Sequence, residues 1–305
     1  MLESILTPEF FNAILRATTP ILFATLAAGV AQQSGICNMA LEGIMLFCAL
    51  FGVIFSSMTQ SWVLGIILTM ITGGLIGLVM AFFVLNLKTD EILAAIAINL
   101  VASGSTVLLL LAYSGDRGTS ASVASVSAPV VNIPVIEAIP FIGEILSGQN
   151  VLTWLALIMV VVMHLFIYRT PLGLRIRAVG ENLNAAESVG ISSRKIRYIA
   201  LVISGILCSL GGYFMSGGYM NMFSKEMAAG RGFIALAASA MGRNTPVGGF
   251  LVALLFGISQ AFSNAMQLTN IPMELVQMIP YGVVLIGLAI FSYSELRKRA
   301  KLSGK

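Results

Sequence analysis

A basic stretch interrupts a chain that is otherwise almost entirely apolar, and it reads Arg169-Thr-Pro-Leu-Gly-Leu-Arg-Ile-Arg-Ala-Val-Gly-Glu-Asn-Leu-Asn-Ala-Ala-Glu-Ser-Val-Gly-Ile-Ser-Ser-Arg-Lys-Ile-Arg197. It holds six of the seventeen Lys and Arg residues, and long apolar runs precede and follow it. Charges beside membrane spans stay in water, and an excess of Lys and Arg marks the cytoplasmic face. The stretch therefore predicts a cytoplasmic loop, which orients the rest of the chain.

The composition places this chain in a bilayer. Of its 305 residues, 58% are hydrophobic and 10% charged, and the mean hydropathy is +0.96; soluble domains are about 25% charged. Thirty glycines and only nine prolines suit helices that pack closely through small residues. The net charge of +4 comes from cations beside spans, so it implies no nucleic-acid partner. We predict an all-α integral membrane protein.

Hydropathy divides the chain into candidate spans. A hydrocarbon core of ~30 Å needs about 20 apolar residues per helix. The candidates fall near residues 13–31, 36–57, 62–86, 91–112, 151–168, 197–216, 229–242, 246–264 and 274–292. They predict one polytopic domain over residues 1–305, a helical bundle of about 8–10 transmembrane helices.

Two of these candidates leave alternatives open. The polar stretch Gln32-Gln-Ser-Gly35 breaks the apolar pattern, so eight spans with a re-entrant first hairpin are also consistent with the sequence. Residues 229–242 are short and rich in Ala and Gly, which also fits a half-helix shielded by its neighbours. We keep this segment as a crossing because the sidedness of the charged loops requires it.

Counting crossings outward from residues 169–197 assigns the other loops to a side. Residues 88–91 fall inside, residues 57–61 fall outside, and the N-terminus falls outside. After Ser294 the tail reads Glu-Leu-Arg-Lys-Arg-Ala-Lys, and its basic charge also predicts a cytoplasmic C-terminus.

The polar loop 113–150 falls outside the membrane and is long enough to dock a partner. Loops of this length are either functional or disordered. A partly ordered connector with an interfacial helix near residues 135–147 is the simpler interpretation, and docking remains the alternative.

Within the basic stretch, residues 182–189 are predicted to form a short helix. Glu181 and Asn182 favour its N-terminal end, and Gly190 is placed as its C-terminal stop. The pair Ala185 and Ala186 would give it a small exposed face that could seat in a groove of a partner. From the residues alone, an inert basic loop that obeys the same charge bias explains the stretch equally well.

A resemblance decides between these interpretations. The run from Ala178 to Ile191 resembles the cytoplasmic loop of ABC-transporter permeases, in the branch that imports ribose-type sugars, nucleosides and branched-chain amino acids. In that family the short helix is the coupling helix, which rests on the ATP-binding subunit. The matching residues are Gly180, Glu181, Asn182, Ala185, Ala186, Gly190 and Ile191.

Three further motifs occur in the family's order. Gly35-Ile-Cys-Asn-Met-Ala-Leu-Glu-Gly-Ile-Met45 is similar to the Asn-x-x-x-Glu-Gly-x-Met element of nucleoside-type permeases. Residues 88–100 resemble the family's entry to the fourth span, and residues 230–257 its late signature. Ribose permeases usually have a version of the first element richer in Asp and Ser, and branched-chain amino acid permeases commonly carry His-Gly there. The Glu-Gly version favours nucleosides.

The resemblance implies a permease subunit of an ATP-driven nucleoside importer in the bacterial cytoplasmic membrane, working by alternating access. The implied partners are an ABC ATP-binding subunit, a second homologous permease in a heterodimer, an extracytoplasmic substrate-binding lipoprotein or protein, and membrane lipid. A permease for a ribose-like sugar and an ion-coupled secondary transporter remain as alternatives.

The sequence predicts no cofactor, no metal site and no catalysis by this chain. Cys37, Cys48 and Cys208 lie in apolar runs without Cys-x-x-Cys pairing, as buried small hydrophobes do. His164 has no second histidine or nearby carboxylate that would suggest a metal site or proton relay. No Gly-x-x-x-x-Gly-Lys-Ser/Thr loop is present, so ATP hydrolysis is expected in a separate subunit.

Polar residues inside apolar spans are the candidates for the transport pathway. An acidic residue such as Glu42 costs ~3 kcal/mol near the centre of a span, so it must face protein or water. Such residues either join helices in a structural network or meet the cargo, whose ribose hydroxyls need donors and acceptors and whose base can stack on an aromatic ring. Both interpretations stay open for the candidates, which are Asn38, Glu42, Asn99, Phe233, Gln260 and Asn264.

Overall fold

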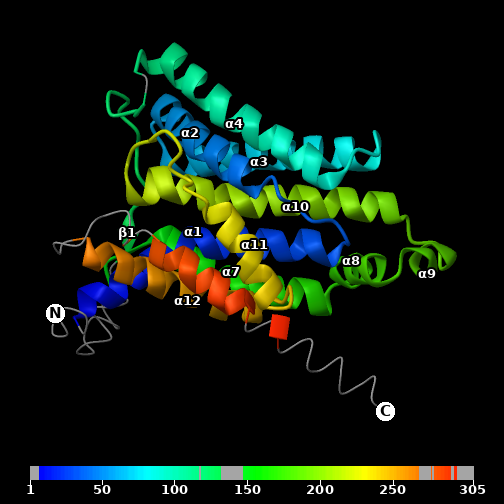
Figure 1. Ribbon diagram of the computed structural model, residues 1–305. Helices are drawn as coiled ribbons and strands as arrows, with labels where there is room; N and C mark the ends of the chain where they lie inside the picture. Colours follow the sequence, from blue (N-terminus) through cyan, green and yellow to red (C-terminus); the bar gives the residue numbers. More distant parts are fainter. Residues whose placement is uncertain are drawn as a thin grey trace.

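The computed structural model describes residues 7–116, 118–131, 147–267, 276, 278–289 and 292–293, and these form a bundle of helices (Figure 1). The predicted all-α membrane architecture is confirmed, because seven of the described helices are long and apolar enough to cross a bilayer. They are α1 (Pro8–Gln33), α2 (Leu41–Thr59), α3 (Trp62–Leu85), α4 (Glu91–Ser114), α7 (Val151–Arg169), α10 (Ser193–Tyr213) with its π-helical continuation η1 (Phe214–Tyr219), and α12 (Pro246–Met266). The shorter helices are α8 (Pro171–Glu181), α9 (Leu183–Ser188), α11 (Arg231–Met241) and Met278–Ala289. Strands β1 (Val130–Val131) and β2 (Gln149–Asn150) pair antiparallel.

The centre of the bundle is formed by α1 and α10, which are the most buried of the long helices. Helix α10 packs against α1, α2 and α3. Its contact with α3 requires small residues, because a Cβ at Gly205 would lie 2.1 Å from the Gly73 carbonyl oxygen. Such backbone-to-backbone approach drives helix association where hydrophobicity does not. Helices α3, α4 and α7 are the least buried of the long helices and carry exposed apolar side chains such as Leu75, Leu100 and Val161, as lipid-facing helices do.

The two ends of the bundle differ in charge. At one end, here called the basic end, α8 lies beside the ends of the long helices and α9 projects beyond them (Figure 1). The turn after α3 lies there too, because Arg194 and Tyr198 both donate hydrogen bonds to Asn86 Oδ1. At the opposite end, Gln149 Nε2 donates to the Asn12 carbonyl oxygen at 3.3 Å. Helix α1 therefore begins at the end opposite to the basic loop, as the count of crossings predicts.

Two crossings are only partly helical, and the first follows α1. The chain reverses at residues 34–40 in a non-helical conformation, and α2 begins only at Leu41. The predicted span 36–57 is therefore correct in place, but its first residues form an irregular segment, here called the reversal segment (residues 34–40).

The second broken crossing corrects the prediction of a transmembrane helix at residues 229–242. Helix α11 has 11 residues, or about 16 Å of length, roughly half of a hydrocarbon core. The chain nevertheless passes between the two ends, since Ser120 N–H donates to the Phe223 carbonyl oxygen at the opposite end and Gln33 Nε2 donates to the Asn244 carbonyl oxygen at the basic end. Residues 220–230 make the first part of this crossing and α11 the second. The half-helix interpretation is correct, and the sidedness is preserved.

Irregular backbone at membrane depth needs protein around it, and the described part of loop 113–150 supplies some of this cover. Lys225 N–H donates to the Gly118 carbonyl oxygen at 2.7 Å, and Thr119 pairs with Ser224 in an isolated bridge. The helix predicted near residues 135–147 lies almost wholly outside the described residues, as does the tail after Ser294.

The last described helix, Met278–Ala289, runs alongside α11. Tyr281 Oη donates to the Ala229 carbonyl oxygen at 3.0 Å, and a Cβ at Gly287 would lie 2.6 Å from the Met241 side chain. The helix therefore runs in the same direction as α11, towards the basic end.

Candidate functional site

The predicted short helix at the basic end is present as α9. Asn182 begins it with its side chain accepting the Ala185 N–H at 3.0 Å. Gly190 ends it at φ +81°, a conformation that favours glycine, and Ile191 N–H bonds back to the Ala186 carbonyl oxygen at 3.1 Å. The start and stop signals in the sequence therefore placed this helix correctly.

Helix α8 was missed by the sequence analysis, although its start signal was visible. Thr170 is its N-cap, and the Thr170 hydroxyl oxygen accepts the Gly173 N–H at 3.2 Å. Pro171 follows at the first helical position, where its fixed φ suits a helix and no N–H is needed.

The exposed face of α9 differs from the predicted Ala-Ala knob. Ala185 is exposed, but Ala186 is 4% exposed and packs inward. Val189 is 74% exposed and forms the apolar tip of the element. Glu181 and Asn182 are also exposed, whereas Ile191 packs against the core.

Gly180 is exposed, but its Cβ direction points into the protein. A Cβ on this residue would lie 2.1 Å from the Gln33 carbonyl oxygen and 3.1 Å from the Gly35 nitrogen. Arg197 Nε donates to the Ser34 carbonyl oxygen at 3.1 Å. The last turn of α8 and the first turns of α10 therefore rest directly on the reversal segment.

Side chains from α4 and α10 satisfy the backbone of the reversal segment. Glu91 Oε2 accepts the Cys37 N–H at 2.8 Å, and Asn99 Nδ2 donates to the Met39 carbonyl oxygen at 3.0 Å. Asn38 Nδ2 donates to Ser204 Oγ at 3.0 Å and is fully buried. Buried backbone groups without a helical partner need such bonds. Asn38 therefore belongs to a structural network.

Glu42 joins the starts of the two incomplete helices. Its Oε1 accepts the Gly230 N–H and its Oε2 accepts the Gly232 N–H, each at 2.7 Å. A carboxylate at a helix N-terminus is favourable because the first N–H groups are unpaired and the helix dipole is positive there. Glycine is required at 232, since a Cβ would lie 2.5 Å from the Glu42 nitrogen. The Glu42 carboxylate thus ties α2 to α11 across 190 residues of sequence.

Asn99 lies in the same cluster as Glu42, and its position on α4 shows how deep in the membrane this cluster lies. Its Oδ1 accepts the Gly43 N–H at 2.8 Å. Asn99 lies eight residues beyond Glu91, the first residue of α4, which is about 12 Å along the helix axis. The cluster therefore lies within the apolar layer.

A cavity of about 330 Å³ opens beside this cluster and is here called the acidic pocket. Helix α4 contributes Asn99 and Ser103, α2 contributes Glu42, and the segment before α11 contributes Glu226. The structure thus brings two of the predicted pathway residues, Glu42 and Asn99, to one cavity. Ser103 and Glu226 were missed, because no pattern in either segment pointed to a pairing with Glu42.

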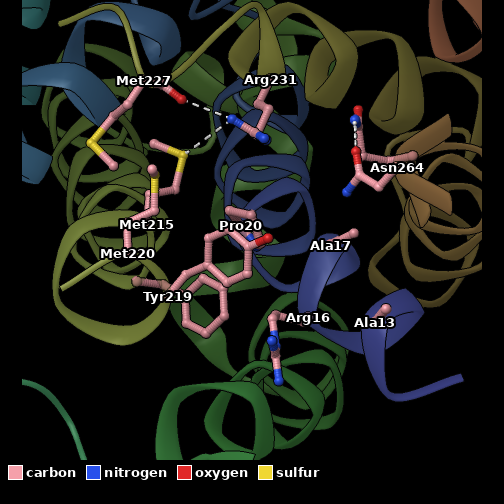
Figure 2. Close-up of a pocket in the computed structure, with 12 residues that line it drawn as sticks. Ala13, Arg16, Ala17, Pro20, Met215, Tyr219, Met220, Met227, Arg231 and Asn264 are labelled. Carbon is pink, nitrogen blue, oxygen red and sulfur yellow. Dashed lines mark hydrogen bonds between the residues drawn. The ribbon is translucent and has the colours of Figure 1, made fainter. Parts of the chain in front are cut away.

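Gln260 and Asn264 lie in a different and smaller cavity of about 90 Å³, shown in Figure 2. Gln260 Nε2 donates to Asn264 Oδ1 at 3.2 Å. Arg16 lies 5.7 Å from the Tyr219 ring centroid, and Arg231 Nη1 donates to the Met227 carbonyl oxygen at 2.7 Å. In the conformation that the structure describes, this cavity, which Arg16 and Arg231 line, is too small to hold a nucleoside.

Phe233, the remaining pathway candidate, lines neither of these cavities. It lies on α11 and is 47% exposed. The structure therefore distributes the six predicted pathway residues over a buried network, two cavities and one exposed helix face.

Comparison with known proteins identifies the family. The family described as branched-chain amino acid transport system / permease component matches residues 10–288. The chain belongs to this permease family. It is a multi-pass membrane protein, with seven long apolar helices in the described part of the chain.

Individual relatives are similar over most of this permease. It is 31% identical to the nucleoside ABC transporter permease protein NupC of Lactococcus lactis, over 93% of this chain and 92% of the relative. It is 31% identical to the guanosine ABC transporter permease protein NupQ of Bacillus subtilis, over 92% and 90%. The putative glucose ABC transporter permease protein TsgC13 of Haloferax volcanii is 28% identical over 86% and 79%. No solved structure matches the permease.

Proposed function

We propose that this permease is the membrane subunit of an ATP-driven importer of nucleosides. The observation that carries the cargo class is the 31% identity, over more than nine tenths of the chain, to a permease named for nucleosides. The Glu-Gly element that favours nucleosides supplies the carboxylate beside the acidic pocket, at Glu42. The catalytic step, ATP hydrolysis, belongs to a partner subunit.

The ATP-binding subunit docks on α9. This helix projects from the basic end, and its exposed surface includes the small or apolar residues Ala185, Val189 and Gly190 beside the charged Glu187. Arg194 and Lys195 flank it on the membrane side, where they suit anionic headgroups. In this proposal the basic end is cytoplasmic, and the direction of Met278–Ala289, towards that end, supports the expected cytoplasmic side for the tail.

A second, homologous permease completes the membrane part of the importer. Lactococcus lactis has a further nucleoside ABC transporter permease protein, NupB, that is 32% identical to this chain over 51% of its length. We infer that this permease likewise pairs with a second, homologous permease in a heterodimer. A substrate-binding lipoprotein or protein delivers cargo to the opposite end of the bundle.

The contacts between these elements support alternating access. A push on α9 moves α8, whose Gly180 touches the carbonyl oxygen of Gln33. The reversal segment moves with it and leads directly to Glu42, which holds the start of α11. Two packings of α2 against α11, each favoured by a different nucleotide state, give the two accessible sides.

Competition uptake into proteoliposomes tests the cargo. Uptake of labelled guanosine by proteoliposomes that contain the complete complex is measured in the presence of an excess of unlabelled adenosine, ribose or leucine. We expect nucleosides to compete and the other compounds to have no effect. Transport of ribose with no uptake of guanosine would show a sugar permease instead.

A further inference from the structure

The lining of the acidic pocket is rich in hydrogen-bond acceptors. Glu42 and Glu226 contribute carboxylates, and Asn99 and Ser103 contribute an amide and a hydroxyl. No Lys or Arg belongs to the described residues that line the cavity. Arg231 lies outside this lining but interacts electrostatically with Glu42, whereas Glu226 is exposed and has no cation beside it among the described lining residues.

The polar groups of the pocket retain unused hydrogen-bonding capacity. Glu42 accepts two N–H groups, whereas a carboxylate has about four acceptor sites. Asn99 donates one of its two amide hydrogens and accepts one bond. Within the described part of the chain, the Ser103 hydroxyl and the Glu226 carboxylate form no hydrogen bond or ion pair. All four groups are therefore available to a ligand.

We propose that the acidic pocket binds the ribose of the cargo through its 2′- and 3′-hydroxyl groups. Each hydroxyl donates one hydrogen bond and accepts others, which matches carboxylates that only accept beside an amide and a hydroxyl that also donate. The volume of about 330 Å³ lies in the range of small-molecule sites.

This inference rests on the proposed function and identifies the part of the cargo that the permease itself recognises. The substrate-binding protein also selects cargo, so a difference between ligands alone would not locate the contact. A double-mutant cycle removes that ambiguity, because selection by the binding protein is the same for both permease variants and cancels.

The cycle combines one change in the permease, Ser103→Ala, with one change in the nucleoside, the removal of its ribose hydroxyl groups. Uptake of guanosine, 2′-deoxyguanosine and 2′,3′-dideoxyguanosine is measured in proteoliposomes that contain the complete complex. We expect Ser103→Ala to raise the KM for guanosine about 3- to 10-fold, the loss expected for one hydrogen bond, and to leave the KM for the dideoxy compound unchanged. Glu226→Gln should show the same pattern with a larger effect, because hydrogen bonds to charged groups are stronger.

Ser105→Ala is the matched control. Ser105 lies on the same helix, does not line the pocket, and its hydroxyl donates to the Val101 carbonyl oxygen of its own helix. This variant should transport all three nucleosides with the wild-type KM.

Two results would overturn the inference while leaving the importer intact. Equal KM increases for guanosine and dideoxyguanosine in Ser103→Ala would show that the residue does not contact the hydroxyls. Uptake that depends on added Na⁺ or Ca²⁺ and ignores the hydroxyls would assign the carboxylates to a cation. If the wild-type complex takes up no nucleoside at all, the proposed function fails and the ribose site fails with it.

Discussion

Substitution of Gly180 by alanine should separate ATP hydrolysis from transport. The added Cβ would lie 2.1 Å from the Gln33 carbonyl oxygen and 2.8 Å from its carbon, both of them backbone atoms. Since contacts below 3.0 Å are essentially never formed, α8 and the end of α1 must separate by about 1 Å. Overpacking of this kind costs about 1–3 kcal/mol, which the fold tolerates but a tight mechanical contact does not.

We expect nucleoside uptake by Gly180→Ala to fall at least about 10-fold, the effect of roughly 1.4 kcal/mol, while ATPase activity of the complex is retained. The assay measures both rates on the same proteoliposomes, with membrane abundance as a check on folding. Gly104→Ala is the matched control, because Gly104 is also helical and a Cβ there would meet nothing within 4 Å. Uptake that falls only in proportion to ATP hydrolysis would refute transmission through this contact.

Three further tests, two of them with a comparison variant, address the other contacts. Glu42→Gln replaces one of the two oxygens that accept the Gly230 and Gly232 N–H groups, and it should lower the free energy of unfolding by about 1–3 kcal/mol, measured by denaturant unfolding. Glu181→Gln removes an exposed ion pair of 3.5 Å and should change the free energy of unfolding by less than about 1 kcal/mol. Equal effects of the two variants would contradict the role of Glu42 in joining α2 to α11. Ala185→Arg should abolish co-purification of the ATP-binding subunit while the permease keeps its normal abundance in the membrane. Ala186→Arg should instead reduce the abundance of the permease, because Ala186 is buried. Retained co-purification in Ala185→Arg would show that the ATP-binding subunit docks on another surface. Gly205→Ala should lower the thermal midpoint of the bundle because its Cβ would lie 2.1 Å from a backbone oxygen of α3, and an unchanged midpoint would argue against this helix contact.

The sequence predicted the parts of this fold that depend on local chemistry. Hydropathy located the long helices, and the charges at residues 88–91 and 169–197 placed both segments at the same end, where Arg194 now bonds to Asn86. Asn182 and Gly190 defined α9 because caps act within a few residues.

The remaining features depend on contacts between distant residues. Hydropathy counts apolar residues without showing how the chain completes a crossing, so residues 229–242 were read as a full span although α11 covers only the second part of this crossing and residues 220–230 make the first. The Glu42 carboxylate was recognised as costly in lipid, but its partners Gly230 and Gly232 expose only backbone N–H groups, which no side-chain pattern reveals. The inward direction of Ala186 was missed because a six-residue helix is too short to show a periodic apolar face.

The most direct test of the central claim is the energy source of transport. Labelled guanosine is offered to proteoliposomes that contain the complete complex and its substrate-binding protein, with ATP or with a non-hydrolysable analogue inside, in the presence or absence of a protonophore. An ATP-driven importer predicts accumulation with ATP alone, unaffected by the protonophore. Accumulation that proceeds with the analogue and collapses with the protonophore would contradict it and indicate an ion-coupled transporter.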